Sequence, residues 1–194
     1  MRRLSQAISE GDGISLIAPA PDVQTAQDAE RQGAEGVVVE RDLGGMREAT
    51  GLPILWRADG TPAEALNGGA DALLVAAQDL EDDADRLERR CAEAQDLGLE
   101  YVVEVRDADE LELALERLDP EIFLLAPENA RDSDDPLEHV LDLLPDVPAG
   151  KLAIADLVVT TPDEIAALER AGVDAVIVGA QNIAGLVRAA PPEV

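Results

Sequence analysis

The chain has very few of the residues that carry metal and redox chemistry. Its 194 residues include one cysteine, Cys91, and one histidine, His139. One cysteine cannot form an internal disulfide, which fits a reducing compartment. One histidine without a cysteine pair does not supply the ligands of a zinc site. We therefore expect no disulfide, no metal site and no cofactor.

Long apolar runs are also missing. No run approaches the ~18 residues that a membrane-spanning helix needs. The first residues, MRR, are followed by polar residues rather than by the apolar stretch of a signal peptide. These absences predict a cytoplasmic protein without a membrane partner.

Positive charge is scarce and negative charge is abundant. Asp and Glu number 42 against 15 Lys and Arg, and the net charge is −27 at pH 7. At molar salt the Debye length falls to about 3 Å, which screens the self-repulsion of such a chain, so we expect a high-salt cytoplasm. The alternative is an acidic decoy for a basic partner, which the even spread of acid along the chain disfavours. Without basic patches we expect no nucleic-acid partner.

The apolar content is ordinary in amount but unusual in kind. It makes up 46% of the chain, with one Trp, one Tyr and one Phe, so nearly all of it is small and branched. Such residues suit parallel strands buried on both faces. Short apolar runs alternate with amphipathic stretches, and eight of these runs predict strands at 14–18, 36–40, 53–57, 72–76, 101–105, 122–125, 152–156 and 175–178.

Strict alternation of strands and helices predicts parallel strands joined by right-handed crossovers. We expect one compact (β/α)8 TIM barrel over 14–190, with a short N-terminal segment (1–13) and a tail (191–194). The alternative is an open doubly wound sheet, which the lack of a Gly-rich loop after the first strand disfavours in its nucleotide-binding form.

Two local patterns recur along the chain. A glycine, a small residue, an acid and an apolar run follow one another at 33–39, 69–75 and 172–178, and each glycine is placed to end a helix. Thr-Pro-x-Glu at 61–64 and at 161–164 provides a Thr cap, a Pro at the first helical position and a Glu at the third.

Several segments resemble the indole-3-glycerol phosphate synthase family, whose members close the indole ring in the tryptophan pathway. They are VVEVRDADEL (102–111), GADALLVAA (69–77), TTPDE (160–164) and GVDAVIVG (172–179). The likeness can be traced over 14–187. It implies a barrel whose site lies at the carboxyl ends of the strands, and a small phosphorylated ligand.

The family's site residues are only partly matched. Glu104 on the fifth strand and Gly179 after the eighth lie at matching positions, with Gly179 and Ala180 expected near phosphate. Arg57 stands where the family carries a lysine that acts as general acid, and arginine keeps its proton over the useful pH range. Asp156 stands where the family has a glutamate base.

Other departures weaken the match. The first strand leads into APAPD (18–22), without the family's Glu and Lys. Asn129 is displaced from the family's sixth-strand Asn, and we expect it, like Gly179 and Ala180, to bind the phosphorylated ligand. A long helix ahead of the barrel, which the resemblance implies, is expected to be missing. An acid or base role for Glu104 competes with a structural ion pair to Arg57.

The remaining singular residues have plainer interpretations. We expect Lys151 to be a solvated loop residue at the amino-terminal end of the barrel, His139 to lie on an outer helix surface over 134–144, and Cys91 to be core. Trp56 either plugs the barrel mouth or lies beneath a helix.

Three functions remain open. The first is a family homologue that no longer closes the ring and acts by binding a ligand, as a scaffold or in regulation. The second is an active carboxy-lyase of the family with a rebuilt site using Glu104, Asp156 and Arg57. The third is a structural component with a protein partner or in a homo-oligomer.

Overall fold

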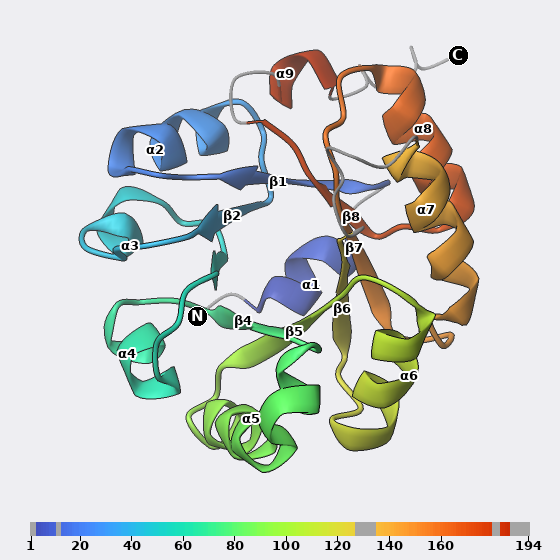
Figure 1. The fold of residues 1–194 in the computed structure, drawn as a ribbon. Helices are drawn as coiled ribbons and strands as arrows, with labels where there is room; N and C mark the ends of the chain where they lie inside the picture. The colour runs from blue at the N-terminus through green and yellow to red at the C-terminus, as the bar shows by residue number, and fades with distance from the viewer. Residues whose placement is uncertain (1–2, 11–12, 127–134, 180–182, 187–194) are drawn as a thin grey trace.

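A computed structural model describes residues 3–10, 13–126, 135–179 and 183–186. Eight parallel strands pair in chain order, and β1 also pairs with β8, which closes the barrel (Figure 1). The (β/α)8 prediction is therefore confirmed, and the open-sheet alternative is wrong. The strands are β1 (Ser15–Pro19), β2 (Gly36–Val39), β3 (Ile54–Trp56), β4 (Ala72–Ala76), β5 (Glu100–Val105), β6 (Ile122–Leu125), β7 (Leu152–Asp156) and β8 (Ala175–Ile177).

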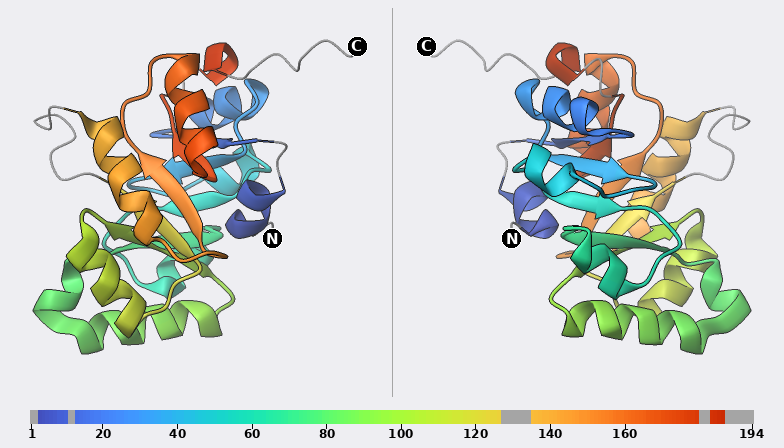
Figure 2. Two further views of the ribbon diagram at one scale, coloured as in Figure 1. Left: turned by 90° about the vertical axis from the view of Figure 1, so that its right-hand side faces the viewer. Right: turned by 90° about the vertical axis from the view of Figure 1, so that its left-hand side faces the viewer.

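Helices surround the barrel and alternate with the strands (Figures 1 and 2). They are α1 (Leu4–Ser9), α2 (Val23–Arg31), α3 (Met46–Ala49), α4 (Pro62–Asn67), α5 (Asp79–Asp96), α6 (Ala108–Arg117), α7 (Pro136–Leu143), α8 (Pro162–Ala171) and α9 (Ile183–Leu186), with a 3-10 turn at Leu144–Asp146. No helix in the described ranges is long and apolar enough to cross a membrane. The predicted tail (191–194) lies outside the described residues.

The predicted helix boundaries arise from local chemistry. At the start of α4, the Thr61 hydroxyl accepts from the Glu64 N–H, and the Glu64 carboxylate accepts from the Thr61 N–H. Thr161 and Glu164 form the same capping box at the start of α8. Gly172 ends α8 with φ = 100°, in the left-handed region that a side chain disfavours. Gly33 and Gly69 also have positive φ.

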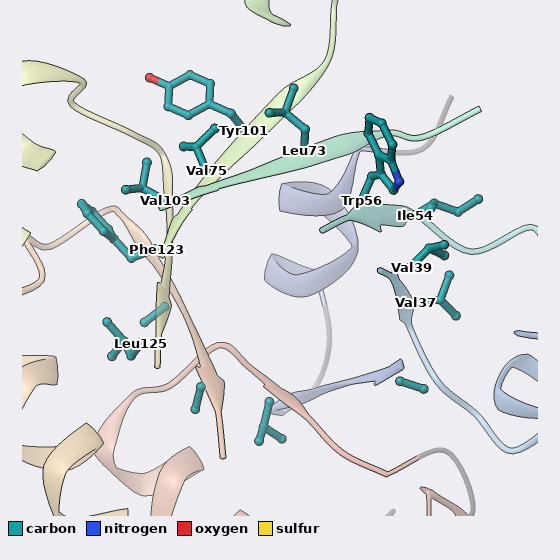
Figure 3. Close-up of a cluster of buried hydrophobic side chains, with 14 of the residues drawn as sticks. Val37, Val39, Ile54, Trp56, Leu73, Val75, Tyr101, Val103, Phe123 and Leu125 are labelled. Atoms are coloured by element: carbon teal, nitrogen blue, oxygen red, sulfur yellow. The ribbon is translucent and has the colours of Figure 1, made fainter. Parts of the chain in front are cut away.

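Side chains alternate between two cores. Inward-facing apolar side chains such as Ile17, Leu55 and Ile154 fill the barrel, and the outward-facing set packs beneath the helices. Figure 3 shows part of the outer set, including Phe123 and Trp56. Trp56 is 9% exposed and donates from Nε1 to the Arg41 carbonyl (2.8 Å), so it lies in the outer core and does not plug the mouth.

Helix α1 closes the amino-terminal end of the barrel (Figure 1). The Leu4 and Ile8 side chains join the interior core. The Glu100 carboxylate accepts bonds from the Leu4 N–H (2.5 Å) and from the Ser5 hydroxyl, which fixes the helix to β5. The opposite end, where the strands finish, is left for a site.

Two of the plainer interpretations need correction. Lys151 is not simply solvated, because its Nζ donates to Asp119 Oδ1 (2.6 Å) and its side chain is only 22% exposed. His139 lies on α7 but is half-buried, with Nε2 2.8 Å from the Arg106 carbonyl oxygen. Cys91 is buried as expected, and burial raises the pKa of its thiol to about 12.

Candidate active site

Three of the predicted site residues meet at the carboxyl end of the barrel. Arg57 follows β3 directly, Glu104 is the fifth residue of β5, and Asp156 ends β7. Arg57 Nη2 donates to Glu104 Oε2 (2.8 Å), and Nη1 donates to Asp156 Oδ2 (2.6 Å). One guanidinium therefore bridges two carboxylates that are 52 residues apart in the chain.

The strand pattern explains why these side chains converge. On β5, Tyr101 and Val103 belong to the outer core while Val102 belongs to the interior core, so the alternation turns Glu104 inward. On β7 the same alternation places Ile154 and Asp156 inside. Barrel interiors are filled in layers by alternate strands, and β3, β5 and β7 are the alternate strands that build this one.

The cluster is largely desolvated but open to water on one side. Its side chains are 31% exposed at Arg57, 20% at Glu104 and 24% at Asp156. Burial acts to lower the pKa of Arg57, but the charges of Asp156 and Glu104 and their hydrogen bonds raise the pKa of Arg57 overall. The guanidinium is thus fixed in its charged form, and the cluster carries one net negative charge.

Each carboxylate keeps one oxygen free. Glu104 Oε1 and Asp156 Oδ1 make no hydrogen bond with the residues that the structure describes. These oxygens can accept bonds from a hydroxyl, an amine or water at the mouth. The arrangement can therefore bind donor groups, whereas proton donation from Arg57 is excluded by its raised pKa.

Of the residues expected near phosphate, Gly179 is described, and it makes no hydrogen bond with this cluster. Gly179 lies just after β8 and is exposed, and its φ is not positive. A Cβ there would contact no atom of the described residues within 4 Å. Its backbone conformation therefore does not require glycine. Ala180 and Asn129 lie outside the described residues.

Sequence reasoning missed two arginines near the mouth. Arg90 reaches from α5 and donates from Nη2 to the Ala58 carbonyl (3.2 Å), immediately after Arg57. Arg106 follows β5 and is held by Glu110, which accepts from its Nε (2.9 Å) and from its backbone N–H (2.8 Å). The available signal for Arg90 was its spacing with Arg86 and Arg89, which places three arginines on one helix face.

Comparisons with known proteins identify the family of this chain and bear out the barrel fold. A family model described as indole-3-glycerol phosphate synthase matches residues 62–186. The chain is 40% identical over 111 residues to an indole-3-glycerol phosphate synthase of Variovorax paradoxus, covering 57% of this chain and 41% of that protein. It is 33% identical over 174 residues to the enzyme of the same name from Laribacter hongkongensis, covering 87% of this chain and 61% of that protein. The chain therefore spans less than two thirds of either relative.

Solved structures share the fold at low identity. An N-acetylmannosamine-6-phosphate 2-epimerase from Clostridium perfringens aligns with a TM-score of 0.67 at 14% identity, over 85% of this chain and 86% of that one. A mutant tryptophan synthase alpha-subunit from Pyrococcus furiosus aligns with a TM-score of 0.67 at 16% identity, over 87% of this chain and 88% of that one. These likenesses show the barrel alone. Because the family model covers more than half of the sequence, the chain belongs to the indole-3-glycerol phosphate synthase family.

Proposed function

We propose that this chain does not close the indole ring and that it binds a small ligand at the carboxyl end of its barrel, as a non-catalytic, scaffolding or regulatory family member. The observation that supports this most directly is the bridge from Arg57 to Glu104 and Asp156. The family resemblance implies a lysine at the position of Arg57, acting as general acid. A positioned general acid contributes about 10²–10⁴-fold in rate, and a guanidinium whose pKa is raised further cannot supply it.

The first strand supports the same proposal. The family pattern implies a Glu and a Lys at its carboxyl end, where this chain has Ala18, Pro19 and Ala20. Ala18 and Ala20 are buried and apolar, so this side of the mouth offers no charged group from β1. Two of the family's charged functions are therefore absent from the described mouth, and a third is replaced.

What remains at the mouth favours binding. The free oxygens of Glu104 and Asp156 accept hydrogen bonds from hydroxyl or amine groups, and Arg57 offers charge to an anion that displaces a carboxylate. The family resemblance makes small phosphorylated sugars the first ligand class to test. The alternative is a structural role with a protein partner or in a homo-oligomer. Light scattering at molar salt would distinguish a monomer from an assembly.

A second candidate function rests on the same geometry. Glu104 and Asp156 occupy inward-facing positions at strand ends, where barrel enzymes carry their catalytic groups. An active carboxy-lyase of tryptophan biosynthesis would then use these two carboxylates as acid and base, with Arg57 as an electrostatic clamp.

Calorimetric titration separates the two candidates. Wild type is titrated in several molar KCl with the synthase substrate, 1-(o-carboxyphenylamino)-1-deoxyribulose 5-phosphate, and with its dephosphorylated analogue. We expect binding without turnover, weakened by Glu104→Gln and unchanged by Glu112→Gln, an exposed matched control on α6. Steady turnover in the calorimeter that Glu104→Gln lowers about 10²-fold would instead support the active enzyme. No binding of any ligand to folded protein would contradict both.

A further inference from the structure

A cavity lies on the outside of the barrel, between α4 and α5. Its volume is about 750 Å³, within the range of small-molecule sites. The loop after β3 forms one wall through Asp59 and Gly60, and charged residues of α5 form the other. The bridged carboxylates Glu104 and Asp156 do not line it, so it is separate from the candidate active site.

Three arginines of α5 border this cavity and make no ion pair with any residue that the structure describes. Arg86, Arg89 and Arg90 are spaced i, i+3 and i+4, which puts them on one helix face. The guanidinium groups of Arg86 and Arg89 contact no acceptor among the described residues. Arg90 is half-buried and makes one bond, to the Ala58 carbonyl, while its Nε–H is buried without an acceptor in the described part of the chain.

Six carboxylates line the same cavity. Glu64 and Asp83 accept bonds from nearby backbone N–H groups. The other four, Asp59, Asp79, Asp82 and Glu93, accept no hydrogen bond from any residue described. In contrast, Arg47 pairs with Asp71 and Arg117 with Glu88. Arginines and carboxylates thus line one cavity without forming ion pairs with each other in the described part of the chain.

We propose that this cavity binds a small zwitterion of the α-amino-acid class, with its carboxylate on the arginines and its ammonium on the aspartates. A simple anion would pair with the guanidiniums but lie close to the lining carboxylates. A simple cation would pair with the carboxylates but lie close to the three guanidiniums. A ligand that carries both charges satisfies both groups, and guanidinium forks suit carboxylate geometry. The buried Leu87 supplies an apolar surface for the ligand's side chain.

The molecule carries its own reporter for this site. Gly60 lines the cavity and lies directly against the indole of Trp56, so that a Cβ at residue 60 would clash with the ring. Trp56 is the single tryptophan of the chain. A ligand that contacts the loop at Asp59 and Gly60 therefore alters the surroundings of this indole, and its intrinsic fluorescence reports binding.

The test titrates L-leucine and L-alanine against the folded protein at constant KCl, following Trp56 fluorescence and heat. Acetate and ethylammonium serve as the two separate charged halves. We expect both amino acids to bind and neither half to bind measurably. Arg90→Gln and Asp82→Asn should each weaken binding about 10-fold or more, because each removes a charge-assisted bond. Arg31→Gln on α2 is the matched control and should not change the affinity, because within the described ranges the Arg31 side chain pairs with Asp28 alone.

Three results would overturn the proposal. They are no binding of either amino acid to folded protein, acetate or ethylammonium binding as tightly as the amino acids, and unchanged affinity in both substituted proteins. Arg89→Gln tests whether weaker binding comes from misfolding, because Arg89 is exposed and makes no hydrogen bond or ion pair with a described residue. It should weaken binding without moving the thermal midpoint. None of these outcomes depends on the ligand or the activity proposed for the barrel mouth.

Discussion

Removing the guanidinium from the mouth of the barrel should destabilise the protein measurably. In Arg57→Met the carboxylates of Glu104 and Asp156 lose bonds of 2.8 and 2.6 Å and face each other without a cation. Breaking a fully buried ion pair by removing one partner costs about 3–5 kcal/mol. Here the three side chains are 20–31% exposed, so water partly replaces the lost bonds, and we expect a loss of about 2 kcal/mol in the free energy of unfolding.

The loss should also depend on the partner that remains. Because part of the cost is repulsion between two carboxylates, adding Glu104→Gln to Arg57→Met should recover a fraction of it, on the order of 0.5–1 kcal/mol. Glu104→Gln alone should destabilise. Glu104→Gln should thus stabilise the Arg57→Met protein but destabilise wild type, as expected when the three side chains are energetically coupled.

Urea unfolding followed by circular dichroism at fixed KCl measures these values. A chain of this size shifts its thermal midpoint by about 2–4 °C per kcal/mol, so Arg57→Met should lower the midpoint by roughly 4–8 °C. Arg31→Gln, at an exposed surface pair, is the control and should fall within about 0.5 kcal/mol of wild type. A loss below 0.5 kcal/mol for Arg57→Met, or additive effects in the double variant, would refute the bridge as a stabilising element.

Three further predictions concern the rest of the fold. Thr161→Ala removes the side-chain cap of α8 and should lower the free energy of unfolding in urea by about 1 kcal/mol. Thr161→Ser keeps the hydroxyl and should retain most of the wild-type stability. Equal losses in the two variants would show that the capping box is not formed. Burial raises the pKa of the Cys91 thiol to about 12, so iodoacetamide at pH 8 should alkylate it about 1,000-fold more slowly than a free thiol. The free energy of unfolding should fall as the pH rises from about 9 to 12, because the thiol of the unfolded chain loses its proton first. Rapid alkylation of the folded protein would contradict this. The charge of −27 predicts an unfolding free energy that rises from low to molar KCl, and a flat dependence would remove the argument for adaptation to high salt.

Much of the barrel follows from local signals in the sequence. The apolar runs locate all eight strands within one or two residues, because a strand buried on both faces leaves a continuous apolar pattern. Gly172 and Thr161 mark helix ends for reasons that involve only neighbouring residues. The closure of β1 on β8 does not follow in this way, because alternation of strands and helices suits an open sheet as well.

The sequence predicts which residues stand at the site better than it predicts which of them contact one another. Glu104 and Asp156 stand out as acids at the ends of apolar strands, and the fold brings both to one mouth. The ion pair with Arg57, considered as the structural alternative for Glu104, is present, and the same guanidinium also holds Asp156. The environments of Lys151 and His139 were misjudged because their partners, Asp119 and the Arg106 carbonyl, come from distant segments.

Turnover of the synthase substrate by wild-type protein tests the central claim most directly. The protein is first shown to be folded by circular dichroism in several molar KCl, and formation of indole-3-glycerol phosphate is then followed by its fluorescence. We expect no rate above the buffer control, because Arg57 cannot act as the general acid. A sustained rate that Glu104→Gln abolishes and Glu112→Gln leaves intact would contradict it, and would show an active enzyme on a rebuilt site.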